Sequence, residues 1–166
     1  MHDYMAERVK KEVYLNKYQP EEPSREIKQL IDEAKKAALN AYAPYSNFQV
    51  GAALLLDDGK IITGNNQENA CYPTGLCAER VAFFSAKSQY PDSKILRVAI
   101  VAKRSVDDFF KLATPCGSCR QAMSEYENNQ NQNIAVYLAD ADGTVFESES
   151  IDNLLPFKFS DKDLKS

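Results

Sequence analysis

Two short segments contain most of the residues that could do chemistry in this chain of 166 residues. They are Cys77-Ala78-Glu79-Arg80 and Pro115-Cys116-Gly117-Ser118-Cys119-Arg120. We expect each segment to begin a helix, because Cys77 precedes the mainly apolar run 81–85 and Cys116 follows a proline. Unpaired backbone amides and the positive end of the helix dipole stabilise a thiolate at such a position. The cysteines are therefore predicted to be good metal ligands.

The spacing of these cysteines indicates a zinc site with one open position. Cys116 and Cys119 are three residues apart, which places both sulfurs on one side of a helical turn. With Cys77 they would provide three ligands and leave the fourth position to water, as in a catalytic zinc site. The alternatives are ordinary buried cysteines, two disulfides, or a closed structural site that also uses Cys71. We favour the open site because a carboxylate at position 79 has no role in a structural one, and we expect Cys71 to be a small buried residue.

Glu79 and Arg80 suggest what such a zinc ion would be used for. Zinc lowers the pKa of its water from about 15.7 to roughly 7 in favourable sites, and a nearby carboxylate can take that proton and pass it on. Glu79 is placed to approach this water without binding the metal. Three thiolates and one dication sum to a negative charge, which Arg80 could offset by hydrogen-bonding the sulfurs.

The composition narrows the class of protein. With 44% hydrophobic and 27% charged residues, the chain is predicted to form one globular domain with a normal core. The net charge of -4 argues against a nucleic acid as the partner. No apolar run approaches the roughly 20 residues that span a bilayer, so we expect a soluble protein without a membrane partner. The single histidine is His2, near the terminus, which excludes histidine-dependent triads and histidine-ligated metals.

The N-terminus has no signal-peptide pattern, and a C-x-x-C spacing outside secreted proteins more often indicates metal binding or redox chemistry than a disulfide. We therefore expect reduced thiols and a cytoplasmic location.

Hydrophobic periodicity predicts an α/β fold. Ser24 is expected to cap a helix that ends before Pro44, and a helix is expected at each cysteine segment. The predicted elements that follow the first helix are strands 48–56 and 60–63, a polar connection 64–76, helix 77–89, strand 95–102, a helix from 115 to about 127, and strands 134–139 and 144–147. This order predicts a three-layer α/β/α fold with a mixed five-stranded sheet and the cysteine helices as crossovers. Their first turns would meet at the carboxyl ends of strands, where such sheets bind ligands.

The chain is predicted to have two parts. Residues 1–23 read as an N-terminal extension of unknown role, in which helix and edge strand both remain possible. Residues 24–166 would form the catalytic domain.

The sequence C-A-E followed by P-C-x-x-C resembles the signature of zinc-dependent nucleoside and nucleobase deaminases, and a cysteine as the first ligand indicates the cytidine deaminase family. Other stretches are similar to those of the small homotetrameric cytidine deaminases, namely 43–53, 66–70, 72–73 and 154–156. The resemblance extends from about Ile27 to Leu164.

This resemblance implies hydrolytic deamination of cytidine and 2′-deoxycytidine, with one Zn²⁺ per chain and Glu79 as the proton carrier. It implies that Asn66 and Glu68 bind the ribose hydroxyls. The backbone amide of Ala78 would bind the pyrimidine carbonyl. Phe48 would form an aromatic wall beside the substrate, with simple core packing as the alternative.

The resemblance also implies a homotetramer in which subunits share their active sites. Tyr72 and Phe159 would belong to the shared part of the site, although Phe157 is an alternative to Phe159 and all three could be packing residues.

Three other functions compete with this interpretation. A blasticidin S deaminase is disfavoured by the pair Asn66 and Glu68, because that antibiotic carries a modified sugar. Nucleic-acid editing is disfavoured by the acidic balance and by a cysteine where editing enzymes usually have histidine. A zinc-stabilised interaction module without catalysis remains the alternative from a different class.

Overall fold

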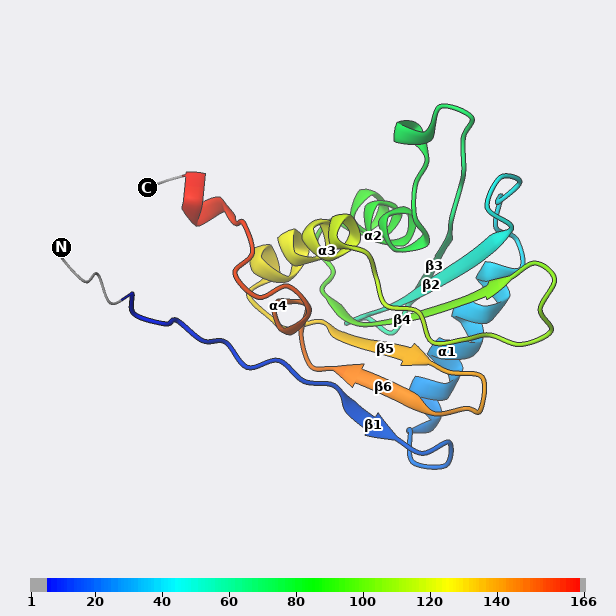
Figure 1. Ribbon diagram of the computed structural model, residues 1–166, viewed down its shortest axis with the longest axis horizontal. Helices are drawn as coiled ribbons and strands as arrows, with labels where there is room; N and C mark the ends of the chain where they lie inside the picture. Colours follow the sequence, from blue (N-terminus) through cyan, green and yellow to red (C-terminus); the bar gives the residue numbers. More distant parts are fainter. Residues whose placement is uncertain (1–5, 165–166) are drawn as a thin grey trace.

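The structure is a computed structural model that describes residues 6–164, so the expectation for His2 lies outside the described residues. Its centre is a mixed sheet of six strands in the order β1-β6-β5-β4-β2-β3 (Figure 1). The strands are β1 (Asn16–Tyr18), β2 (Phe48–Leu56), β3 (Ile61–Asn65), β4 (Ile95–Arg104), β5 (Ala135–Ala139) and β6 (Val145–Ser148). Among the neighbouring strands of the described sheet, only β4 and β5 are parallel, and the other pairs are antiparallel.

Helices cover both faces of this sheet, as predicted. They are α1 (Arg25–Ala38), α2 (Ala78–Gln89), α3 (Gly117–Gln130) and the short α4 (Ile151–Leu154), with 3₁₀ turns η1 (Tyr72–Thr74) and η2 (Asp161–Leu164). Successive residues of a strand point to opposite faces. In β2, Ala52 and Leu54 accordingly pack in the core under α2 and α3, while Ala53 and Leu55 pack under α1. The three-layer α/β/α fold is confirmed.

The first helix begins and ends where the sequence predicts. The Ser24 hydroxyl oxygen accepts a hydrogen bond from the amide of Ile27 at 3.3 Å, which satisfies one of the free amides of the first turn. The helix stops at Ala38, ahead of Pro44.

The predicted number of five strands is wrong, because β1 adds a sixth at the edge of the sheet. β1 pairs antiparallel with β6 from inside the predicted N-terminal extension. Its three residues are too few to show a periodicity. Side-chain hydrogen bonds add to the backbone pairing: the Tyr18 hydroxyl and the Asn16 amide both donate to the Glu147 carboxylate, at 2.7 Å and 3.3 Å.

The connections place α2 and α3 together. Both β3 and β4 run antiparallel to β2, so they point in the same direction. Because α2 follows β3 and α3 follows β4, both helices begin at the same edge of the sheet. Gly64 lets α2 lie close to β3: a Cβ on this residue would be 2.5 Å from the amide nitrogen of Ala82.

Within residues 6–164, no helix is both long enough and apolar enough to cross a lipid bilayer.

Candidate active site

The three cysteines of the two predicted metal segments lie together. The sulfurs of Cys77, Cys116 and Cys119 are all within 4.8 Å of one another, and Cys116 Sγ lies 3.5 Å from Cys119 Sγ. Cys77 is the N-cap residue of α2, Cys116 is the N-cap residue of α3, and Cys119 lies in the first turn of α3. The two crossovers therefore bring all three sulfurs to one point at the edge of the sheet.

The cluster has the size and the chemistry that zinc needs. Zinc–sulfur bonds of about 2.3 Å in a tetrahedron place the sulfurs roughly 3.8 Å apart, within the observed range. Neither Cys77 nor Cys116 uses its side chain to cap its helix, so both sulfurs remain available as ligands. Cys119 is buried, Cys77 is half-buried and Cys116 is exposed. Three convergent thiols that are open on one side fit a zinc ion with a free position.

Cys71 does not belong to this cluster. It is exposed, at the start of the η1 turn, and the expectation that it is buried is wrong. The reason is local: it lies in the polar connection between β3 and α2, where residues 69–74 are all exposed. In the described structure the cluster consists of Cys77, Cys116 and Cys119, and the closed four-cysteine alternative has no fourth sulfur there.

A cation lies beside the sulfurs. The Arg80 Nη2 group donates to the Gly75 carbonyl at 3.3 Å and lies 3.8 Å from Cys77 Sγ. A hydrogen bond from Cys119 lowers the pKa of the Cys77 thiol, and Arg80 lowers it further against the effect of burial. The Arg80 Nε atom is buried without a hydrogen-bond partner in the described structure. The hydrogen bond with Cys77 and burial raise the pKa of the Cys119 thiol. The arrangement therefore favours negative charge on the Cys77 sulfur, and a metal ion would have to displace the proton of Cys119.

Glu79 is the carboxylate next to the cluster. It lies in the first turn of α2 and only 4% of it is exposed. Burial raises the pKa of the Glu79 carboxyl, and the neighbouring Cys77 raises it further, while the backbone amide at the helix start opposes both effects. A carboxyl group whose pKa is shifted upward holds a proton more readily than an exposed one, as a general acid–base residue must.

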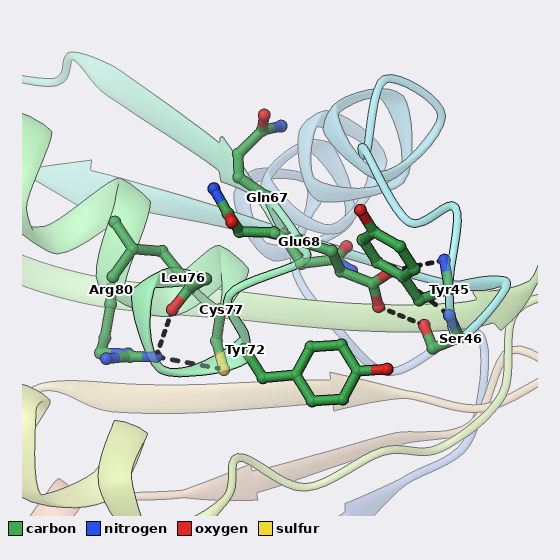
Figure 2. A pocket seen from close by; sticks show the side chains of 11 residues that line it. Tyr45, Ser46, Gln67, Glu68, Tyr72, Leu76, Cys77 and Arg80 are labelled. Carbon is green, nitrogen blue, oxygen red and sulfur yellow. Dashed lines mark hydrogen bonds between the residues drawn. The ribbon is translucent and has the colours of Figure 1, made fainter.

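A cavity of about 500 Å³ opens beside the cluster. Figure 2 shows Cys77 and Arg80 on one side of it, Tyr45 and Ser46 on the other, and Tyr72 between them. The walls come from the loop after α1 and from the connection between β3 and α2. The lining residues are Tyr45, Ser46, Asn66, Gln67, Glu68, Asn69, Tyr72, Gly75, Leu76, Cys77 and Arg80.

Glu68 lines this cavity and also holds the opposite loop in place. Its carboxylate accepts hydrogen bonds from the amide of Tyr45 at 2.9 Å and from the amide and hydroxyl of Ser46 at 3.2 Å and 2.5 Å. The Ser46 hydroxyl is the main cause of a lowered pKa for the Glu68 carboxyl. Glu68 is therefore an ionised hydrogen-bond acceptor at the cavity wall.

Asn66 also lines the cavity, but its side-chain amide is bonded to the strand behind it. The Oδ1 atom accepts from the amide of Val50 at 2.8 Å, and Nδ2 donates to the carbonyl of Phe48 at 2.9 Å. These bonds fix the Asn66 loop to the start of β2.

Of the other predicted residues, only Tyr72 lines the cavity. Ala78 is fully buried at the first position of α2, and Tyr72 is 75% exposed, with its ring 6.0 Å from that of Tyr45. Phe48 is half-buried at the start of β2, and Phe159 is 58% exposed in the C-terminal segment. Among the described residues, neither phenylalanine lines the cavity. Of the predicted residues, the cavity lining thus includes Asn66, Glu68, Tyr72, Cys77 and Arg80. Cys116 and Cys119 join Cys77 in the sulfur cluster, and Ala78 and Glu79 are buried behind it in the first turn of α2.

Sequence reasoning did not identify Tyr45 and Ser46 as cavity residues. Their signal is the polar turn after Pro44, directly before a strand that begins at Phe48. Only the fold shows that this turn faces the connection 64–76.

Known proteins with a similar sequence or structure share one description. The family model for the cytidine and deoxycytidylate deaminase zinc-binding region matches residues 24–135. A cytidine deaminase of Sporosarcina psychrophila is 43% identical over 139 residues, which are 84% of this chain and 95% of that protein. A probable cytidine deaminase of Dictyostelium discoideum is 40% identical over 139 residues, covering 84% of this chain and 87% of that protein. The crystal structure of cytidine deaminase from Burkholderia pseudomallei is 40% identical, with a TM-score of 0.68, and the match covers 80% of this chain and 98% of that chain.

The cysteine cluster predicts which thiols retain zinc. Replacing Cys116→Ser removes one ligand and disturbs the start of α3, so bound zinc is expected to fall from about one ion per chain to nearly none. The matched variant Cys71→Ser alters an exposed thiol outside the cluster and is expected to keep its zinc. Inductively coupled plasma mass spectrometry of the dialysed proteins measures both contents. Full zinc in the Cys116 variant, or loss of zinc in the Cys71 variant, would contradict the assignment.

Proposed function

Because the chain belongs to the cytidine and deoxycytidylate deaminase family, we propose that it catalyses the hydrolytic deamination of cytidine and 2′-deoxycytidine, a step of pyrimidine salvage. The products are uridine or 2′-deoxyuridine and ammonia. One observation carries this proposal: the sulfurs of Cys77, Cys116 and Cys119 lie together, buried Glu79 follows Cys77 in the first turn of α2, and Cys77 itself lines a cavity of about 500 Å³. That volume lies within the usual range of small-molecule sites.

The three cysteines would hold one zinc ion per chain. When bound, zinc supplies a water whose pKa is lowered toward neutrality. The proposed task of Glu79 is to move protons. Its carboxylate takes a proton from the attacking water, whose oxygen bonds to C4, and gives that proton to ring nitrogen N3. It then takes the second proton, from the new hydroxyl on C4, and gives it to the amine, so that the C4 carbonyl forms as ammonia leaves. The raised pKa of the Glu79 carboxyl supports this role, because the group must be able to hold a proton between these steps.

Arg80 would keep the sulfur cluster anionic. Its guanidinium lies 3.8 Å from Cys77 Sγ, close enough to offset part of the negative charge of the thiolates. The proposed effect is to favour deprotonation of water beside a cluster that is otherwise rich in negative charge.

Other residues of the cavity would orient the nucleoside. We assign the ribose hydroxyls to Glu68, which is an ionised acceptor on the wall, and to Asn66, which fixes the same loop. The backbone amide of Ala78 is one of the free amides at the start of α2 and would donate to the pyrimidine carbonyl. Phe48, at the start of β2, would pack beside the substrate.

A homotetramer that shares its sites between subunits is the proposed assembly. Two exposed aromatic residues support it, since Tyr72 is 75% exposed at the cavity and Phe159 is 58% exposed. The exposed position of Cys116 supports it as well, because a neighbouring subunit would shield that ligand from solvent. We further propose a cytoplasmic location, where the four free cysteines stay reduced, and a catalytic domain 24–166 preceded by an extension 1–23.

A substrate panel tests the proposed reaction. Zinc-loaded protein is mixed with cytidine, 2′-deoxycytidine, blasticidin S or a single-stranded oligonucleotide that contains cytosine, and ultraviolet absorbance and ammonia are followed. We expect turnover of the two free nucleosides and none of the other two compounds. Turnover of blasticidin S or the oligonucleotide in preference to the nucleosides would refute the substrate assignment, and no turnover at all would indicate a non-enzymatic zinc module.

The proton role of Glu79 predicts a separation of catalysis from metal binding. The variant Glu79→Gln keeps the size of the side chain and is not a sulfur ligand, so its zinc content should equal that of the wild type. Its kcat for cytidine should fall by about 10²- to 10⁴-fold, the usual contribution of a general acid–base residue. The control Glu33→Gln changes a carboxylate on α1 that forms an ion pair with Lys36, and should leave kcat unchanged. Near-normal kcat in a zinc-replete Glu79 variant would disprove the role.

The proposed assembly predicts a mass in solution and a shared residue. Light scattering coupled to size-exclusion chromatography should give about four times the chain mass of 18.6 kDa. The variant Phe159→Ala should keep that mass and raise KM for cytidine, because the aromatic contact with a neighbouring site is lost. A monomeric wild type, or a KM that the variant does not change, would contradict this part of the proposal.

A further inference from the structure

An extended segment near the N-terminus lies against the C-terminal part of the fold. Residues 11–18, here called the strap, pass along β6 and α4 (Figure 1). One side-chain amide binds the strap as a neighbouring strand would: Asn153 Oδ1 accepts from the amide of Tyr14 at 3.1 Å, and Asn153 Nδ2 donates to the carbonyl of Tyr14 at 2.6 Å. The Lys11 ammonium adds an ion pair with Asp152 at 2.6 Å. The strap therefore holds α4 from outside.

The same short helix is held from inside by α3. The buried carboxylate of Glu127 accepts hydrogen bonds from the amides of Ile151 at 2.8 Å and Asp152 at 2.9 Å. These are two of the free amides at the start of α4. A helix of four residues has little stability of its own, so its position depends on these outside contacts.

Arg120 connects the end of α4 to the start of the metal helix. Its Nη1 group donates to the carbonyl of Leu154, the last residue of α4, at 2.8 Å. Its Nε group donates to the carbonyl of Pro115 at 2.8 Å. Pro115 is buried and directly precedes Cys116, whose own side chain is exposed and makes no capping bond. The planar guanidinium presents its donors in a fixed geometry, so it fixes the positions of the Pro115 and Leu154 carbonyl groups relative to each other.

We propose that Arg120 is a positioning residue that holds the Cys116 ligand at the zinc site, and that α4 and the strap are its anchor. Arg80 and Arg120 have different roles at the cluster. Arg80 contacts the sulfur of Cys77, whereas Arg120 donates its hydrogen bonds to the backbone carbonyls of Pro115 and Leu154. Its effect on the metal is exerted through the position of Cys116. Both α4 and the strap lie outside residues 24–135, which the family model matches.

Release of zinc from the loaded full-length protein tests this proposal. A coloured chelator in excess records the release rate at a temperature where circular dichroism shows every variant folded. The variant Arg120→Gln should release zinc about tenfold faster than the wild type, the lower end of the effect of residues that support metal ligands. Arg120→Lys should lie between the two, since an ammonium on a flexible stem holds the two carbonyls less rigidly. The matched control Arg97→Gln removes an ion pair with Glu26 and should release zinc like the wild type.

The anchor is tested by Asn153→Ala, which removes the amide that binds the strap. Zinc release should again be faster than in the control, by a smaller factor than in Arg120→Gln. If Arg120→Gln and Arg120→Lys release zinc at the rate of Arg97→Gln, the proposal is overturned, even if their unfolding temperatures are lower. A purely structural role would lower the stability of the fold without changing the rate of zinc release below the unfolding transition. If Asn153→Ala alone behaves like the control, the part played by the strap is refuted. The inference rests on zinc binding by the cysteines and not on the substrate, so its failure is distinguishable from the absence of cytidine turnover.

Discussion

The site depends on one constraint: three sulfurs that lie within 4.8 Å of one another must become thiolates to bind zinc, and thiolates repel one another. Thiolates this close are stable only if positive charge surrounds them. The fold supplies it in two forms, the starts of α2 and α3 and the guanidinium of Arg80. A zinc ion would complete the compensation, and the remaining negative charge would rest beside Glu79, whose carboxyl has a pKa that burial raises. The negative charge on the cysteines that would bind zinc therefore also raises the pKa of the carboxyl group next to them.

The architecture brings the two helix starts to one place. Because β3 and β4 point in the same direction and each is followed by a crossover on the same face, α2 and α3 begin side by side (Figure 1). Gly64 sets how closely α2 lies on β3, and Arg120 ties the start of α3 to α4. The cavity is added by loops: Glu68 binds the turn at Tyr45 and Ser46, so the carboxylate and the facing loop stay together. Rigid elements thus position the sulfurs, and connected loops shape the space next to them.

The sequence was most informative where a local interaction determines the structure. The Ser24 cap, the strand at 48–56 and the cysteines at helix starts depend on neighbours within a few residues, and all are present in the structure. The features that the sequence left open or missed depend on contacts between distant residues. β1, one of the two possibilities left open for residues 1–23, pairs with β6 so that Asn16 lies opposite Glu147, and Glu127, on another helix, binds the first amides of α4. Cys71 was misjudged because residue type predicts burial only on average, whereas the loop that carries it faces outward. The bonds of Asn66 to β2 and of Arg120 to two carbonyls are equally invisible in the spacing of residues.

The central claim is that three sulfurs hold zinc and leave one position for a lighter ligand beside Glu79. X-ray absorption at the zinc edge of the purified protein tests it most directly, because sulfur and oxygen scatterers differ in distance, about 2.3 Å against about 2.0 Å. The account predicts three sulfur ligands and one oxygen or nitrogen ligand for each zinc ion. A first shell of four sulfurs, or a protein that binds no zinc, would contradict it.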